Sequence, residues 1–175
     1  MPNTDVLRFI ATLDARRPKG ALYSLAALFA RLARAGAPEE AARIEDRIWD
    51  CWMSHDNAEA EAALDRATTD IAARRYDIAE TRLARLVRRR PDCAEGWHKL
   101  GALHCMLGRD EESLAELRRA LELEPRHFAA LGAIGEILFA GKQGEGAALA
   151  YRAALRVHPH MERGRDRLAL ILGAG

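Results

Sequence analysis

The sequence is poor in aromatic residues, in lysine and in net charge. Aromatic residues make up 6% of the 175 residues, lysine occurs only at Lys19, Lys99 and Lys142, and the formal net charge is +1. Proteins that coat nucleic acid or bind anionic membranes through net charge carry a large basic excess, so this balance argues against both classes. Alanine is abundant instead. Because alanine is the best helix former and fills little core volume, we expect helices that pack closely through small side chains.

Cysteine is also rare, and long apolar runs are missing. Cys51, Cys93 and Cys105 cannot all pair within one chain, and none lies in a CxxC motif, so no disulfide framework is expected. No window approaches 18 uncharged apolar residues, which argues against a membrane-spanning helix. The N-terminal segment lacks the basic start and the unbroken apolar run of a signal peptide. We therefore expect a cytoplasmic protein as the sequence stands, or a periplasmic one if a leader has been removed.

Proline recurs at a fixed interval in the second half of the chain. Pro91, Pro125 and Pro159 are spaced by 34 residues, and each follows one apolar helical stretch and precedes another. Residues 94–127 align in register with residues 128–161, with matched pairs that include Gly101 with Gly135, Ala120 with Ala154 and Leu121 with Leu155. A fixed period of this length is typical of a repeat architecture.

The repeated unit resembles the tetratricopeptide repeat (TPR), a helix-turn-helix whose pattern runs W-x2-L-G-x2-Y, then A-x3-F, A and P. The matching residues of 94–127 are Trp97, Leu100, Gly101, Leu117, Ala120 and Pro125, whereas His104 and Ser113 replace the usual Tyr and Ala. The matching residues of 128–161 are Ile134, Gly135, Leu138, Ala147, Tyr151, Ala154 and Pro159. Because glycine in mid-helix costs about 1 kcal/mol relative to alanine, we expect Gly101 and Gly135 to permit a close helix contact.

The period extends toward the N-terminus with decreasing fidelity, and it predicts an all-α fold. We expect a right-handed α-solenoid of antiparallel helix pairs in one continuous domain. Its expected parts are an N-terminal capping helix (1–19), a degenerate TPR-like pair (20–57), a TPR-like repeat (58–93), two TPR units (94–127 and 128–161) and a C-terminal capping helix (162–175). Helices are expected near 4–16, 20–35, 38–54, 58–73, 77–89, 94–107, 111–123, 128–140, 145–157 and 161–172, with no strand.

Catalytic and metal-binding patterns are absent or weak. The sequence has no GxxxxGK[ST], GxGxxG, GxSxG or HExxH motif, so we expect neither enzymatic activity nor a cofactor. His127, His158 and His160 lie at equivalent turns of neighbouring units. A zinc ion needs ligands within about 2.3 Å, whereas the repeats are spaced by about one helix diameter. We expect helix-terminal or capping histidines here, and a metal or small-ligand carrier using these residues is an alternative.

One helix before Pro91 is strongly basic, with Arg82, Arg85 and Arg89 on its surface. We expect these side chains to pair with an acidic neighbour, for which the glutamates of 111–124 are the candidates. Nucleic-acid association through the Arg82–Arg90 helix is the other alternative. Single-stranded sites also use stacking aromatics, and the absence of aromatics from this helix argues against it.

The resemblance implies a concave groove lined by the first helix of each unit. The candidate groove residues are Tyr23, Leu64, His98, Lys99, Cys105, Met106, Glu136 and Phe139. The family's carboxylate clamp uses Lys and Asn at such positions, and only Lys99 is close to it, so binding of chaperone C-termini is not supported. We expect a non-catalytic adaptor that binds an apolar or amphipathic protein segment in this groove. Self-association is an open alternative, as is occupation of the groove by the chain's own Phe9 and Ile10.

Overall fold

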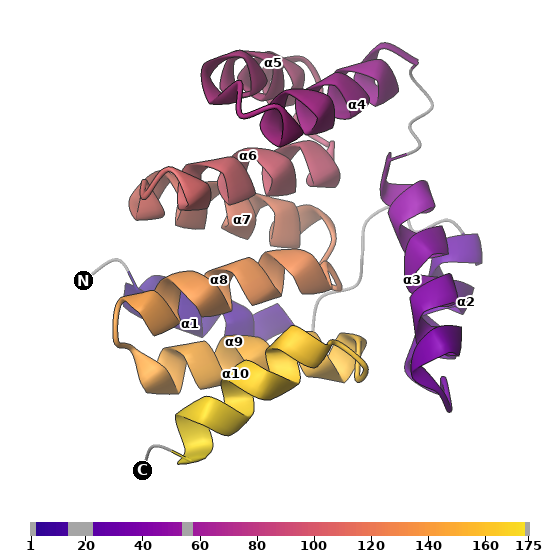
Figure 1. Cartoon of the computed structure of the whole chain (residues 1–175), viewed down its shortest axis with the longest axis vertical. Helices are drawn as coiled ribbons and strands as arrows, with labels where there is room; N and C mark the ends of the chain where they lie inside the picture. Colours follow the sequence, from indigo (N-terminus) through magenta and orange to yellow (C-terminus); the bar gives the residue numbers. More distant parts are fainter. Residues whose placement is uncertain (1–2, 14–22, 54–57, 174–175) are drawn as a thin grey trace.

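The computed structural model describes residues 3–13, 23–53 and 58–173, which form ten α-helices and no strand (Figure 1). The helices are α1 (Asn3–Thr12), α2 (Tyr23–Leu32), α3 (Pro38–Met53), α4 (Ala58–Ala72), α5 (Tyr76–Arg89), α6 (Ala94–Met106), α7 (Asp110–Leu123), α8 (Phe128–Ala140), α9 (Gly144–Val157) and α10 (Glu162–Gly173). Their order and type confirm the all-helical solenoid expected from the 34-residue period.

Three hairpins, α4–α5, α6–α7 and α8–α9, stack in sequence order to form the regular array, and α10 packs on α9 (Figure 1). Each hairpin turns through one residue with positive φ, at Arg74 (57°), Gly108 (71°) and Lys142 (56°). The next residue then donates its backbone N–H to the carbonyl five residues earlier, as Arg109 does to His104. This is the Schellman closure of a helix C-terminus, and it recurs with the period of the sequence.

The small residues of the array lie where its helices meet. A Cβ added to Gly101 would lie 2.8 Å from Cγ of Leu117, and one added to Gly135 would lie 2.7 Å from the ring of Tyr151. Ala120 and Ala154 are fully buried on the partner helices. The expectation that both glycines permit close helix contacts is confirmed, because neither position leaves room for a methyl group without movement of its neighbour.

Helix α1 occupies a different place from the one its sequence position suggests. It packs against α7 and α9, the second helices of the last two repeats, instead of covering the hairpin that follows it. Val6, Phe9, Ile10 and Leu13 are buried in one core cluster with residues of α7 and α9. The expected N-terminal cap is thus a cover of the outer face of the array, and Phe9 and Ile10 do not fill the concave groove.

The hairpin α2–α3 also departs from the expected stack, because it runs across one edge of the array (Figure 1). Its apolar residues form a cluster with Phe128, Ala129 and Val157, which lie beside the turns between repeats. Contact between α3 and α4 is slight. The pair therefore does not continue the array before α4. Its second helix has nearly the expected bounds, whereas α2 ends three residues before the expected 35 and residues 20–22 lie outside the described part of the chain.

Candidate functional site

The concave face of the array is formed by α6 and α8, and one part of it is open. Met106 has 58% of its surface exposed at the end of α6. Helical spacing places it on the same face of α6 as His98 and beside the half-buried Cys105. Leu107, the next residue, is 40% exposed. We call Cys105, Met106 and the adjoining Leu107 the open strip. Cys105 and Met106 are among the groove residues that the sequence predicted.

Helix α10 covers the neighbouring part of α8. Arg163 and Arg167 both donate hydrogen bonds to the Glu136 carboxylate, at 3.0 and 3.1 Å, and Tyr151 donates a third at 2.8 Å. Burial alone would raise the pKa of Glu136, but these three donors lower it to about 2. The guanidinium of Arg167 also lies 4.8 Å from the ring centroid of Phe139. Glu136 and Phe139 are therefore engaged within the chain and form one border of the open strip.

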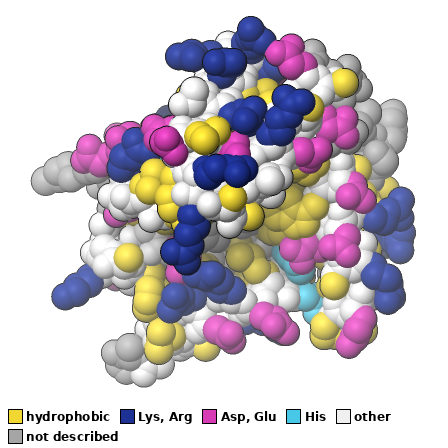
Figure 2. Space-filling model, turned by 45° about the horizontal axis from the view of Figure 1, so that its top comes forward, with side chains coloured by type: hydrophobic (Ala, Val, Ile, Leu, Met, Phe, Trp, Pro, Cys, Tyr) yellow, Lys and Arg dark blue, Asp and Glu magenta, His cyan; other side chains and the backbone are white. Residues whose placement is uncertain are grey.

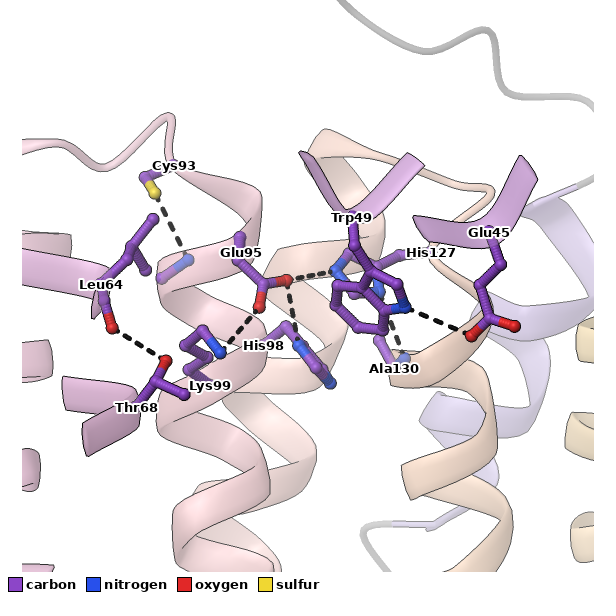
Figure 3. A network of polar contacts seen from close by, with 11 residues as sticks. Glu45, Trp49, Leu64, Thr68, Cys93, Glu95, His98, Lys99, His127 and Ala130 are labelled. Atoms are coloured by element: carbon purple, nitrogen blue, oxygen red, sulfur yellow. Dashed lines mark hydrogen bonds and ion pairs between the residues drawn. The ribbon is translucent and has the colours of Figure 1, made fainter. Parts of the chain in front are cut away.

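Helix α3 covers the other end of the concave face, where α6 and α8 begin (Figure 3). The ring of Trp52 stacks on that of His127 at a centroid distance of 4.0 Å, and Trp49 lies 5.9 Å from both His98 and Phe128. In the space-filling view, histidine side chains are visible where the N-terminal hairpin meets the array (Figure 2). We call this contact region the seam, formed by α3 and the first turns of α6 and α8.

The seam contains a buried carboxylate, Glu95, between two imidazoles (Figure 3). His127 Nε2 and His98 Nδ1 donate hydrogen bonds to the same Glu95 oxygen, at 3.0 and 3.1 Å. The Lys99 ammonium lies 3.4 Å from the other oxygen. Burial alone would raise the pKa of Glu95, but His98 and His127 outweigh burial and hold that pKa well below its usual range.

His127 is also the N-cap of α8, since its Nδ1 accepts a hydrogen bond from the backbone N–H of Ala130 at 3.3 Å. Nδ1 must then be unprotonated, and Nε2 must carry the proton that it donates to Glu95. Burial lowers the pKa of His127, and the adjacent His98 lowers it further. The expected capping role of this turn histidine is confirmed.

The seam does not suit a metal ion, although Glu95, His98 and His127 place ligand atoms within 4.8 Å of one another. A metal on His127 Nε2 would require the proton to move to Nδ1, which faces the Ala130 N–H donor. The Lys99 ammonium would add a repulsive positive charge beside the ion. These four residues therefore form a closed set of internal hydrogen bonds and charges.

The three turn histidines proposed as metal ligands each bind a different partner. His158 Nε2 donates to Glu45 at 2.9 Å, and His160 Nε2 donates to the backbone oxygen of Ala35 at 2.8 Å. Both partners belong to the N-terminal hairpin or its loop, so these histidines fasten the hairpin to the last turn of the array. His127, His158 and His160 therefore do not converge on one point. Their arrangement does not support the alternative of a metal or small-ligand carrier.

Leu64 and Tyr23 are the remaining candidate groove residues. Leu64 was expected in the groove, but it is fully buried in the core between α4 and α5 because it points toward its own hairpin partner. Tyr23 begins α2, and its side chain lies outside the part of the chain that the structure describes.

The basic helix α5 pairs with acidic residues other than those expected. Arg82 and Arg75 both bind the buried Asp70 carboxylate of α4, and Arg75 is the main reason that the pKa of Asp70 lies below its usual value. Arg89 pairs with Glu59, also of α4. The glutamates of 111–124 belong to α7 or, in the case of Glu124, cap its C-terminus, and α6 separates α7 from α5 (Figure 1).

Comparison with known proteins gives the same repeat. Residues 64–123 and 107–162 match a family model described as "Tetratricopeptide repeat". A TPR repeat-containing protein of Rhizobium etli is 30% identical over 111 residues, which are 63% of this chain and 54% of that protein. The chain thus spans about half the length of this curated relative.

Several solved structures have similar folds. A mutant of the Thermobaculum terrenum O-GlcNAc transferase has a TM-score of 0.63 and 27% identity, covering 70% of this chain and 24% of that one. The first TPR of Spaghetti, solved with a bound HSP90 peptide, has a TM-score of 0.64 and 18% identity, covering 68% and 94% of the two chains.

None of the helices in the described ranges has the length and apolar character that crossing a bilayer requires.

Proposed function

The chain belongs to the tetratricopeptide repeat family, and from that premise we propose that it is a non-catalytic interaction module that binds a protein segment on its concave face. The solved TPR of Spaghetti holds an HSP90 peptide, which supports a peptide as the class of ligand. Lys99, the one residue close to a carboxylate clamp, contacts Glu95 instead of lying free in the groove. The proposed partner is therefore recognised by apolar contact and not by a terminal carboxylate.

The observation that carries this proposal is the exposure of Met106. Methionine is flexible and polarizable and suits surfaces that bind apolar side chains. Met106 has 58% of its surface exposed, between the part of the concave face covered by α3 and the part covered by α10. An amphipathic segment laid along this strip would cover Met106 and contact Cys105 and Phe139 at its borders.

The thiols of the array support the non-catalytic part of the proposal. Burial is the main cause that raises the pKa of Cys93 to about 11, and burial also raises the pKa of Cys105. A nucleophilic cysteine needs a lowered pKa. The Cys93 sulfur instead accepts a hydrogen bond from the Gly96 N–H and caps α6.

The test uses Met106→Arg in the full chain, with Leu170→Arg as the matched control. Leu170 is an apolar residue of similar exposure, 54%, on α10. Proteins co-purifying with wild type are identified by mass spectrometry, and their recovery is compared between the two variants. We expect a specific partner to be retained by Leu170→Arg and lost by Met106→Arg. Equal recovery by both folded variants would remove the concave face as the binding site.

A further inference from the structure

The outer face of α4 and α5, turned away from α6, forms a groove at the open end of the array. This groove has a volume of about 660 Å³ and is lined by Glu59, Ala60, Ala63, Arg66, Asp77, Ile78, Thr81, Arg82, Arg85, Leu86, Arg89 and Arg90. In an unbroken solenoid a preceding hairpin would cover this face. Here the preceding hairpin lies on the seam and contacts α4 only slightly, so none of the described helices covers this face.

The groove combines an apolar floor with a basic rim. Ala60 is buried, Ala63 is half-buried, and Ile78, in the first turn of α5, is 44% exposed. Isoleucine is among the residue types that are most often buried. The rim carries five arginines against the two carboxylates of Glu59 and Asp77. Lys and Arg side chains gather at this end of the molecule around small apolar patches (Figure 2). The lining thus has a strong net positive charge although the whole chain is close to neutral.

The arginines of the groove are not equivalent. Arg82 is held by the buried Asp70, and Arg89 pairs with Glu59. Arg66 and Arg85 are exposed, one on each helix, and neither forms an ion pair with another described residue. Two guanidinium groups on opposite walls of an apolar groove are therefore available to carboxylates of a ligand, which arginine binds in a bidentate manner.

The dimensions of the groove favour a helix as the occupant. The lining follows α5 from Asp77 to Arg90, which corresponds to roughly 20 Å, or about 13 residues of a parallel helix. The rest of the array shows how such a face is covered, because each following hairpin lays a helix against the one before it. Nucleic acid is a poorer fit because the lining includes no aromatic side chain on which a base could stack.

We propose that the α4–α5 groove binds an acidic amphipathic helix of a partner protein, with small apolar side chains against Ala60, Ala63 and Ile78 and carboxylates toward Arg66 and Arg85. This surface is separate from the concave strip at Met106. The chain would then hold two partners, or two segments of one partner, at different faces.

The experiment uses a fluorescein-labelled 14-residue peptide with glutamates along one helical face and alanine and leucine along the other. Binding to the full chain is measured by fluorescence anisotropy at two salt concentrations. We expect binding that weakens with salt, and a loss of about tenfold or more in the Arg66→Glu, Arg85→Glu double variant, since charge complementarity sets such contacts. Arg88→Glu is the matched control, because Arg88 is exposed on α5 but does not line the groove, and it should bind nearly as wild type.

Five results would overturn the proposal. Wild type could fail to bind the peptide, a scrambled peptide of equal charge could bind equally well, or Arg88→Glu could weaken binding as much as the double variant. The fourth is tighter binding of a labelled oligothymidylate than of the peptide, which would assign the groove to nucleic acid. A concentration-dependent dimer that the double variant abolishes would assign the groove to a second copy. Met106→Arg should leave binding of this peptide unchanged. A negative result for the α4–α5 groove would therefore be distinguishable from a negative result for the concave face.

Discussion

The regular array (residues 58–161) and the N-terminal hairpin (residues 23–53) are both built from antiparallel helix pairs, but they are joined in different ways. Within the array, Gly101 meets Leu117 and Gly135 meets Tyr151, so backbones approach closely through small residues. The hairpin joins the array through aromatic rings and charged hydrogen bonds, such as that between Glu45 and His158. Close packing at small residues marks the first joint, together with polar contacts such as that of Ser113 with the Gly101 carbonyl, and aromatic rings around a polar centre mark the second.

This difference predicts different responses to change. An apolar contact between close-packed helices depends on shape and is insensitive to pH. The seam depends also on protonation, because the pKa values of its buried Glu95 and His127 both lie below their usual ranges. We infer that the hairpin detaches under conditions that leave the array folded. Three changes, to Trp52, to Gly101 and to the pH, should separate the two joints or show that they are one cooperative unit.

The largest effect is expected from Trp52→Ala. Trp52 is 6% exposed and contacts Phe29, His127 and Phe128 in the seam. Removing a buried tryptophan side chain costs about 3–5 kcal/mol, which here falls on the attachment of the hairpin. Amide hydrogen exchange should accelerate in α2 and α3 and stay near the wild-type rate in α8 and α9. Asp46→Ala, an exposed change on α3, serves as the control, and uniform acceleration over all helices would show a single cooperative unit.

A smaller effect, in the opposite region, is expected from Gly101→Ala. The added methyl group would lie 2.8 Å from Leu117 Cγ and 3.2 Å from its backbone nitrogen, so the two helices must separate. Overpacking of this kind costs about 1–3 kcal/mol, more than alanine gains by its helix propensity. Gly36→Ala is the matched control, because no atom lies within 4 Å of the added Cβ. Urea denaturation measures both, and a Gly101→Ala variant as stable as wild type would contradict the close-contact reading.

The array was predictable from the sequence because its contacts repeat with the sequence. Gly101 and Ala120 stand at fixed places of a 34-residue unit, and each neighbouring unit repeats the same contact in register. The turns at Arg74 and Lys142 follow the same period, although only Gly108 has the residue type that signals a left-handed conformation.

The seam was not predictable in this way. Glu45 and His158 lie 113 residues apart, and nothing in the local pattern of either residue specifies the other. The sequence offered only a weak signal, the pair Trp49 and Trp52 three residues apart on one helix face. Glu95 gave no signal at all, since a glutamate in the first turn of a helix is ordinary. The packing of α1 on α7 and α9 was likewise not predictable from the local pattern, because an amphipathic helix fits any apolar face.

The smallest effect is expected from pH, and between pH 8 and pH 5.5 it should be greatest at the seam, because the lowered pKa values of Asp70 and Glu136 in the array bring losses of stability only at more acidic pH. Burial lowers the pKa of His127 below the unfolded value of about 6.5. Below that pH the unfolded chain takes up a proton that the folded seam does not, so stability present above pH 6.5 is lost as the pH falls toward the folded pKa. Protonation of Nδ1 would also place a donor against the Ala130 N–H and remove the cap of α8. Glu45, whose pKa is lowered chiefly by its hydrogen bond with His158, should add a second loss below about pH 4.5.

Trp97→Phe leaves Trp49 and Trp52 as the reporters of the hairpin, so their fluorescence follows the seam while circular dichroism follows all helices. Between pH 8 and pH 5.5 we expect the denaturation midpoint seen by fluorescence to fall while that of the helices changes less. His127→Gln, added to Trp97→Phe, keeps a polar side chain but cannot titrate, so it should flatten the dependence above about pH 5. Parallel shifts of both signals, or an unchanged slope in His127→Gln, would mean that the seam is not the pH-sensitive joint of this molecule.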